Sequence, residues 1–376
     1  MSFSLARLAA MMIKEFVQMR RDRMTFGMMV GIPLLQLLLF GYAINSDPKH
    51  LPTAILDADH GPMGRSVVAA MQASRYFDIT LLPSSEAAAD DILARGEAQF
   101  VVTIPADFSR RVLRGEHPHL VVEADATDPA ATANALGVIA HIALHAADRD
   151  LAGPHANLRQ GEPPFDLVVH RRYNPEGETA FNIVPGLMGV VLTMTMVIMT
   201  CLAVTRERER GTMESLLAMP LTPLEVMLGK ILPYIAVGYL QVAFILAVAK
   251  LLFAVPMVGS LALLSLVTVV FIAANLAVGF TFSTIAGNQL QAVQMGFFFF
   301  LPSILLSGFM FPFRGMPVWA QAIGEVLPLT HFLRIVRGIL LKGSPWGDLA
   351  IDTLAMAAFM AVAGAIAIKR YRMTLD

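Results

Sequence analysis

Two histidines have the spacing that metal sites on helices use. His141 and His145 stand four residues apart in a stretch with helical character, so that both rings lie on one face. In the zinc-protease version of this face, a glutamate directly follows the first histidine and acts as general base, whereas Ile142 follows His141 here. We therefore interpret the pair as surface histidines, with metal binding as the alternative.

Four aspartates follow predicted strands of the same region, where acidic ligands can collect: Asp57, Asp59, Asp125 and Asp128. Aspartate is also a preferred residue of turns and helix caps, and we assign these four to such roles. The chain has no GxSxG motif, no glycine-rich phosphate loop and no clear acid and base pair. The sequence therefore predicts no catalytic site, no metal site and no cofactor bound by this chain.

Neither the cysteine nor the glycine–lysine pair of the chain supplies chemistry of its own. Cys201 is the one cysteine and stands in an apolar run, where we expect it to pack as a small apolar side chain. Gly229-Lys230 is followed by Ile231 and has Leu224 five places before the glycine, so it is not an ATP-binding phosphate loop. The net charge of -1 also argues against a nucleic-acid partner.

The composition indicates lipid as a solvent for much of the chain. Apolar residues make up 56% and charged residues only 15% of 376 residues, with a mean hydropathy of +0.62. Soluble domains carry about a quarter charged residues. We therefore expect an α-helical polytopic membrane protein that contains an inserted, water-soluble α/β domain.

Six stretches are long and apolar enough to cross a bilayer, which needs about 20 residues of helix. The fourth and fifth lie in a 63-residue run without a charge, Leu251 to Phe313, which polar turns at 255–260 and 287–289 divide. The predicted spans are residues 24–45, 181–205, 231–250, 261–286, 292–312 and 349–368.

Basic residues near the span ends predict the orientation, because they collect on the cytoplasmic side. Such residues precede the first span, follow the second span, and lie in the tail 369–376 after the sixth span. With six spans these three places fall on the same side of the membrane, so both termini are expected to be cytoplasmic. Four further basic residues then lie outside, where we expect their long side chains to snorkel at the membrane interface: Arg314, Arg334, Arg337 and Lys342.

Residues 46–178 have ordinary composition and alternate strand with helix patterns, which predicts a mixed, partly parallel sheet with covering helices. We expect Ser84 to cap one helix, and Pro129 to begin another after Thr127 or Asp128. The predicted strands are 53–57, 76–82, 99–104, 120–124 and 167–171, and the predicted helices 63–74, 84–95, 106–114 and 129–151. By the topology above, this domain is extracytoplasmic.

Two cytoplasmic segments have amphipathic patterns. Residues 1–23 repeat apolar residues at three to four, which is typical of a helix at the membrane interface. The loop 206–229 begins with alternating charges, after which Thr212 can cap a short helix whose apolar edge is Met213, Leu216 and Leu217. Such a helix is either a docking element for a soluble partner or a connector on the membrane surface.

Several motifs in this order resemble the permeases of ABC-2 type exporters. The loop RERERGTMESLLAMPLTPLEVMLGKILPY resembles their cytoplasmic loop, and FGYAIN resembles the end of their first span. The resemblance also covers YNP followed by IVPG before the second span, LPSILLSGFMFPFRGMPVW at the fifth, and PLTHF before the sixth. The chain is particularly similar to the long-insert, multidrug-type members of bacterial two-membrane envelopes.

The resemblance implies the permease half of an ATP-driven exporter in the bacterial inner membrane, with ATP and Mg on a separate ABC ATPase subunit. It implies a dimer, with itself or with a similar permease, around a path for a hydrophobic or amphiphilic substrate, and allows a periplasmic adaptor as a further partner. Residues 1–23 would be the connecting helix before the first span. The residues implied in coupling to the ATPase are Arg206, Glu207, Arg208, Glu209, Arg210, Gly211, Thr212, Met213, Glu214, Leu216 and Leu217. Residues 313–347 would form paired re-entrant helices at an outer gate that includes Pro312, Pro317, Trp319, Pro328 and His331.

Two other classes of function stay open at this point. An ion-driven secondary transporter generally places ionisable groups in mid-membrane, and the predicted spans hold essentially none. A membrane-anchored receptor with an extracytoplasmic ligand-binding domain would need only one or two spans.

Overall fold

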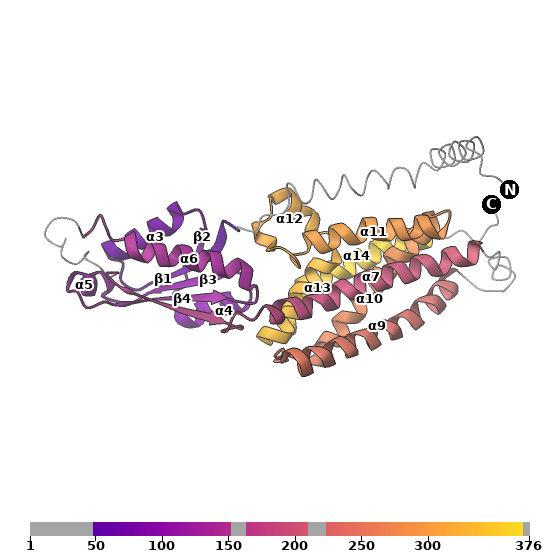
Figure 1. Ribbon diagram of the computed structural model, residues 1–376, viewed down its shortest axis with the longest axis horizontal. Coiled ribbons are helices and arrows are strands. Elements are labelled where there is room, and N and C mark those ends of the chain that lie inside the picture. The colour runs from indigo at the N-terminus through magenta and orange to yellow at the C-terminus, as the bar shows by residue number, and fades with distance from the viewer. Residues whose placement is uncertain (1–47, 152–162, 210–222, 371–376) are drawn as a thin grey trace, which may run out of the picture.

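The computed structural model describes residues 48–151, 163–209 and 223–370, which form an α/β region and a helix bundle placed end to end (Figure 1). The first predicted span, the connecting helix 1–23 and most of the tail 369–376 lie outside these residues. The first described strand begins at Leu51 and the first described bundle helix at Thr179.

The α/β region is built on a five-stranded sheet of order β2-β1-β3-β4-β5. All neighbouring strands are parallel except β3 and β4, so the predicted mixed sheet is confirmed. The strands are β1 (Leu51–Asp57), β2 (Phe77–Leu81), β3 (Phe100–Ile104), β4 (His119–Asp125) and β5 (Asp166–Arg172).

Helices cover both faces of this sheet. Successive side chains of its central strands point to opposite faces, and the side chains on both faces are apolar. Ile55 and Val102 face the larger core, which also contains residues of α3, α5 and α6, whereas Ala54 and Val101 face α4. The helices are α3 (Pro62–Ala73), α4 (Glu86–Ala94), α5 (Phe108–Leu113) and α6 (Pro129–His145).

Two helix ends of the α/β region differ from the prediction. Ser85, not Ser84, caps α4, because Ser85 has the extended backbone that lets its hydroxyl accept from the Ala88 N–H. Helix α6 begins at Pro129 with Asp128 as its cap, as predicted, but ends at His145 and continues as turns to Leu151.

Seven α-helices of the described chain follow the sheet, and five are long and apolar enough to cross a membrane. The five apolar stretches are Thr179–Leu202, Pro233–Phe253, Leu261–Ile285, Gln289–Leu306 and Trp346–Arg370. The helices are α7 (Thr179–Glu209), α9 (Pro223–Phe253), α10 (Leu261–Ile285), α11 (Gln289–Leu306), α12 (Val318–Gly324), α13 (Pro328–Arg337) and α14 (Trp346–Arg370).

The charge-free run divides into two helices at the predicted polar turns. Ser260 caps α10 and Asn288 caps α11, each by accepting a backbone N–H with its side-chain oxygen. The predicted fifth span is wrong at its end, since α11 stops at Leu306 rather than continuing to 312. Gly308 has a φ of 82°, a conformation that leaves the helix and favours glycine.

Helix α10 lies in the centre of the bundle, where it packs against α7, α13 and α14. The rings of Phe271 and Phe332 stack with centroids 4.0 Å apart. Gly279 allows α10 to approach α7 so closely that an added Cβ would lie 2.6 Å from the Val197 carbonyl oxygen. Cys201 packs at the same contact and donates to the Gly279 carbonyl oxygen at 3.3 Å, which confirms its packing role.

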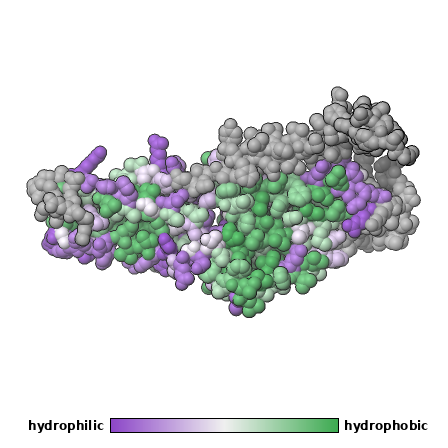
Figure 2. Space-filling view, viewed as in Figure 1, coloured by the Kyte–Doolittle hydropathy of each residue, from purple (hydrophilic) through white to green (hydrophobic). Residues whose placement is uncertain are grey.

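Apolar side chains cover the outside of the bundle as well as its inside. Leu240, Phe244 and Leu251 of α9 are 73%, 69% and 82% exposed. In Figure 2 hydrophobic residues predominate on the visible face of the bundle, whereas hydrophilic residues are common on the α/β region and return at the far end of the bundle. This distribution is the one expected of a protein with lipid around its helices.

Candidate functional site

The end of the bundle away from the α/β region contains the first part of the predicted coupling loop. Helix α7 continues through the alternating charges to Glu209, and Arg206 is exposed near its end. The Glu209 carboxylate accepts the backbone N–H of Gln289 at 2.7 Å and also the side-chain amide of Gln289. These bonds lower the pKa of Glu209 and join the end of α7 to the start of α11.

Most of the predicted coupling residues lie beyond this point. Glu207 and Arg208 belong to the last turn of α7. The residues outside the described part of the chain are Arg210, Gly211, Thr212, Met213, Glu214, Leu216 and Leu217. Their role in coupling stays a prediction.

The segment 313–347 forms short helices at the opposite end of the bundle, beside the α/β region. A 3-10 turn (Phe313–Gly315) precedes α12, and a π-helical stretch (Gly338–Lys342) follows α13. Pro312 and Pro317 each stand directly before a helix and Pro328 is the first residue of α13, where a missing N–H is harmless. The segment therefore contains the predicted pair of short helices divided at Pro328, with Trp319 about half exposed on α12.

His331 is the centre of a polar network between α12, α13 and α14. Its Nε2 lies 2.8 Å from the Glu325 carbonyl oxygen and its Nδ1 lies 2.7 Å from the Asp352 carboxylate. Burial lowers the pKa of His331, but its hydrogen bonds with Asp352 and Glu325 outweigh burial and raise the pKa overall. Because both ring nitrogens face acceptors, the geometry favours the imidazolium.

Arg334 extends this network and also contacts Asp352, a residue that the sequence did not single out. Its guanidinium forms a forked pair with Glu325 at 2.5 and 3.1 Å and reaches Asp352 at 3.5 Å. Asp352 lies in the second turn of α14, inside the predicted sixth span. The signal was a single carboxylate near the start of an otherwise apolar run, with a histidine and an arginine about twenty residues before it.

The expected snorkelling of the outer basic residues is wrong for Lys342 and Arg337, because they point into the junction with the α/β region. Lys342 Nζ lies 2.5 Å from the Asp125 carboxylate and 5.0 Å from the centre of the Tyr173 ring. Both partners of the ion pair are nearly buried. Burial, together with the charge of Asp125, raises the pKa of Tyr173 to about 12.

Arg337 connects three parts of the chain at the same junction. It donates to the Asn182 side-chain oxygen of α7 at 3.0 Å and to the Gly308 carbonyl oxygen at 3.3 Å. Asn182 in turn donates to the Thr127 carbonyl oxygen, between β4 and α6, at 2.7 Å. Arg314 reaches the α/β region directly, with a 3.0 Å bond to the Gly96 carbonyl oxygen.

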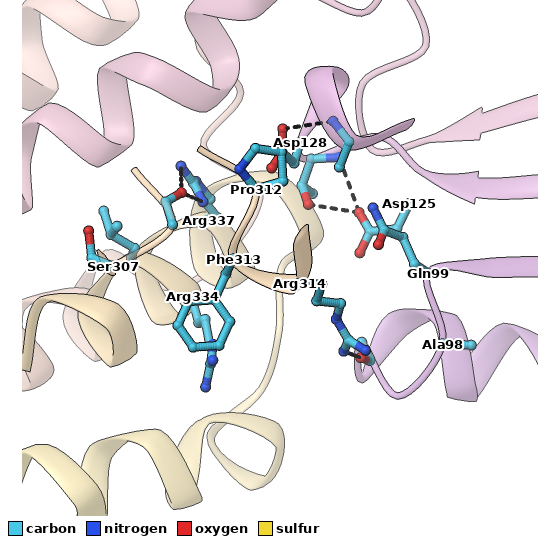
Figure 3. Close-up of a pocket in the computed structure, with 15 residues that line it drawn as sticks. Ala98, Gln99, Asp125, Asp128, Ser307, Pro312, Phe313, Arg314, Arg334 and Arg337 are labelled. Carbon is cyan, nitrogen blue, oxygen red and sulfur yellow. Dashed lines mark hydrogen bonds between the residues drawn. The ribbon is translucent and has the colours of Figure 1, made fainter. Parts of the chain in front are cut away.

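Polar cavities lie around these contacts. One of about 150 Å³ is lined by Asp125 and Asp128 of the α/β region and by Arg314, Arg334 and Arg337 of the bundle. Figure 3 shows these side chains around the cavity, with acidic groups from the α/β region and basic groups from the bundle interspersed around it. The site is therefore a charged interface between two differently built parts of the chain.

The four aspartates have the turn and cap roles predicted for them. The Asp57 carboxylate accepts the N–H groups of Asp59 and His60, and Asp59 accepts those of Gly61 and Ser109. Asp125 and Asp128 accept backbone N–H groups of the following turn and helix. Only Asp125 also has the ion pair with Lys342 that no local pattern indicated.

The two histidines of α6 lie together on one face of the helix. The rings of His141 and His145 have centroids 4.7 Å apart, and His145 pairs with Asp148 at 3.4 Å. Within the described ranges no group of three or more His, Cys, Asp or Glu side chains could hold a metal ion. The pair has the geometry of neighbouring surface side chains on one helix face.

Comparison with known proteins covers nearly the whole chain. The family described as ABC-2 family transporter protein matches residues 23–369. The chain is 31% identical over 357 residues to the probable multidrug ABC transporter permease YbhS of Escherichia coli K12, covering 94% of this chain and 93% of that protein. It is 30% identical over 339 residues to the probable multidrug ABC transporter permease YbhR of the same strain, covering 89% and 90%. It is also 30% identical over 331 residues to the inner membrane transport permease YhhJ, covering 86% of each.

Proposed function

Because the chain belongs to the ABC-2 family of transporter proteins, we propose that it is the membrane-spanning permease subunit of an ATP-driven exporter. The observation that carries this proposal is the family match over residues 23–369, together with relatives of similar length whose names describe multidrug ABC transporter permeases. Five long apolar helices and a lipid-compatible surface support a multi-pass protein of the inner membrane. We propose six spans, with residues 24–45 as the first, both termini in the cytoplasm and the α/β region outside it.

The energy for transport comes, in this proposal, from a separate ATPase subunit that binds ATP and Mg. The predicted coupling residues of the loop contact this subunit, and Glu209 supports the proposal because its bonds to Gln289 join the loop's first turn to α11. A displacement of the loop by the ATPase would thereby reach two bundle helices at once.

In this proposal the permease pairs with a second copy or with a similar permease to form the path for a hydrophobic or amphiphilic substrate. Helix α9 supports this part of the proposal, since much of its apolar surface is uncovered within one copy. The α/β region extends well beyond the bundle, so that its far end could also contact a periplasmic adaptor (Figure 1).

The alternative of an ion-driven transporter has one observation in its favour. The His331 ring is hydrogen-bonded to the Asp352 carboxylate, which lies near the start of the last candidate span. The pair lies at the end of α14 beside the α/β region rather than in mid-membrane, and a coupling site is expected near the midplane. We therefore assign it a positioning role at the outer gate.

Charge reversal in the loop tests the proposal. Glu214→Lys, or Met213→Asp with Leu217→Asp, should release the ATPase subunit and abolish ATP-dependent export from inverted vesicles while the permease stays in the membrane. Glu86→Lys is the matched control, because Glu86 is an exposed acid at the start of α4. Undiminished export by the loop variants, without a co-purifying ATPase, would contradict the proposal. Loss of export when a proton uncoupler is added at constant ATP would favour the ion-driven alternative.

A further inference from the structure

Three cavities at the junction adjoin one another and form a single cleft. The cavity of about 150 Å³ shares Asp128 and Pro312 with one of about 280 Å³. It shares Asp125 and the three arginines of the bundle with another of about 230 Å³. We call these three cavities together the junction cleft.

One part of the junction cleft has an excess of positive charge. The cavity of about 230 Å³ is lined by five cationic and three acidic side chains, so acids of the lining cannot neutralise all of its cations. The cations are Arg95, Arg314, Arg334, Arg337 and Lys342, and the acids are Asp125, Asp348 and Asp352.

The excess can be assigned to two particular arginines. Lys342 is paired with Asp125, and Arg334 with Asp352 and with Glu325 outside the lining. Among the described residues, Arg314 and Arg337 donate only to carbonyl and amide oxygens and form no salt bridge with a carboxylate. The Nε of Arg337 is buried and has no hydrogen-bond partner there.

Asp128, the other acid that lines the cleft, does little to change this. Asp128 uses its carboxylate to accept two N–H groups at the start of α6. Burial raises the pKa of Asp128 and outweighs the opposite effect of Arg337. The neutral carboxyl group is therefore more favoured here than in water. Two guanidinium groups of the cleft therefore lack an anion.

The other part of the junction cleft is mainly apolar. The cavity of about 280 Å³ is lined by Ile183 of α7 and by the turn after α11, from Phe309 to Pro312. It lies where two candidate spans end, Thr179–Leu202 and Gln289–Leu306. An apolar chain bound there would therefore lie at the level where the bundle's lipid-facing helices stop.

We propose that the junction cleft binds an anionic amphiphile. The anionic headgroup, a phosphate, sulfonate or carboxylate, pairs with Arg314 and Arg337, whose planar guanidinium groups suit such oxygens. The apolar chain lies against Phe309, Met310 and Phe311. The headgroup chemistry is common to membrane phospholipids and to free anionic amphiphiles. The inference rests on the proposed function in one respect, that the bound molecule is cargo of the exporter.

Binding can be measured without ATP or the ATPase. The full-length permease is placed in phosphatidylcholine nanodiscs and incubated with radiolabelled dodecyl phosphate, and retention by protein-free nanodiscs is subtracted. Dodecyltrimethylammonium, with the same chain and the opposite charge, reports binding by the chain alone. Inorganic phosphate and phosphatidylglycerol serve as competitors, the first for the headgroup and the second for a membrane lipid.

The substitutions are chosen to separate loss of binding from loss of folding. Arg314→Gln removes an exposed side chain whose one bond to the described residues goes to the Gly96 carbonyl oxygen. Arg337→Gln removes the second cation, and Arg337→Lys keeps its charge. Arg65→Gln is the matched control, because Arg65 is also exposed and donates to a backbone carbonyl, that of His60, outside the cleft.

We expect each Arg→Gln substitution to weaken dodecyl phosphate binding about ten-fold, the effect of one charge-assisted bond. Arg337→Lys should retain most of the affinity, and Arg65→Gln all of it. If phosphatidylglycerol competes with dodecyl phosphate, the occupant is a membrane lipid. If phosphatidylglycerol does not compete, the occupant is a free amphiphile. The inference is overturned if the wild-type protein retains dodecyl phosphate no better than dodecyltrimethylammonium, or if Arg314→Gln with Arg337→Gln binds like the wild type. Export driven by ATP would persist in that case, and the proposed function would stand.

Discussion

The α/β region and the helix bundle place their apolar side chains in opposite ways. In the α/β region, large side chains such as Phe100, Phe108 and Phe165 are fully buried. In the bundle, Phe271 and Phe332 are buried, but α9 and α14 expose Phe244 and Ile351 to 69% and 80%. The first region is folded for water on its outside and the second for lipid, which removes the reason to hide apolar surface.

The difference teaches how the two regions can be joined. The main apolar cores of the two regions are separate, and charged and polar groups contribute to the junction: Lys342 with Asp125, Arg337 with Asn182, and Arg314 with the Gly96 carbonyl. Such contacts have a fixed direction and partner, so they determine how one region sits on the other.

The largest effect should come from breaking the buried ion pair of the junction. Lys342→Met leaves the nearly buried Asp125 without its cation, which costs about 3–5 kcal/mol when one partner of such a pair is removed. We expect a marked fall in the midpoint of thermal unfolding of the detergent-solubilised protein.

Arg95→Gln is the control at the same junction, because its pairs with Glu97 and Asp348 are long and exposed. It should change stability by less than about 1 kcal/mol. Equal effects of the two substitutions would mean that the junction is not held by its buried pair. The double variant Lys342→Met with Asp125→Asn should recover part of the loss.

A matched pair of glycines tests the packing of the two regions. Gly279→Ala in α10 would place a Cβ 2.6 Å from the Val197 carbonyl oxygen, so α7 and α10 must move apart, at a cost of about 1–3 kcal/mol. Gly137→Ala in α6 meets no atom within 4 Å and should stabilise its helix by about 0.5–1 kcal/mol. Thermal unfolding of both variants gives the comparison, and a stabilising Gly279→Ala would refute the close helix contact.

The smallest effect expected is a pH dependence of the His331 network. Because the pKa of His331 is raised in the folded protein, its stabilising contribution is complete below the ordinary value of 6.5 and is lost as the pH rises through the raised value. The wild-type midpoint of unfolding should therefore fall, relative to that of His331→Gln, as the pH rises above 6.5. A difference that does not change with pH would show that the imidazolium is not the stabilising form.

The local pattern predicted most of the elements but not their partners. Alternation and turn residues indicated all five strands, and the polar residues at 260 and 288 marked the division of the charge-free run. The order of the strands, and the antiparallel pairing of β3 with β4 alone, depend on contacts between distant residues. The end of α11 at Leu306 was missed because an apolar turn around Gly308 has the same hydropathy as a helix.

The sequence by itself determined that much of this protein is surrounded by lipid. It also determined the positions of the charge-free runs and the family that the chain resembles. Hydropathy, turn residues and motifs are properties of short stretches, so they need no tertiary contacts to be recognised. Only the tertiary structure decided what the outer basic residues do. Lys342 and Arg337 belong to one short segment, yet their partners lie more than 150 residues away in the chain, at Asp125 and Asn182. A charge has the same sequence signature whether it snorkels or is paired, and its partner is known only when the fold brings the two together.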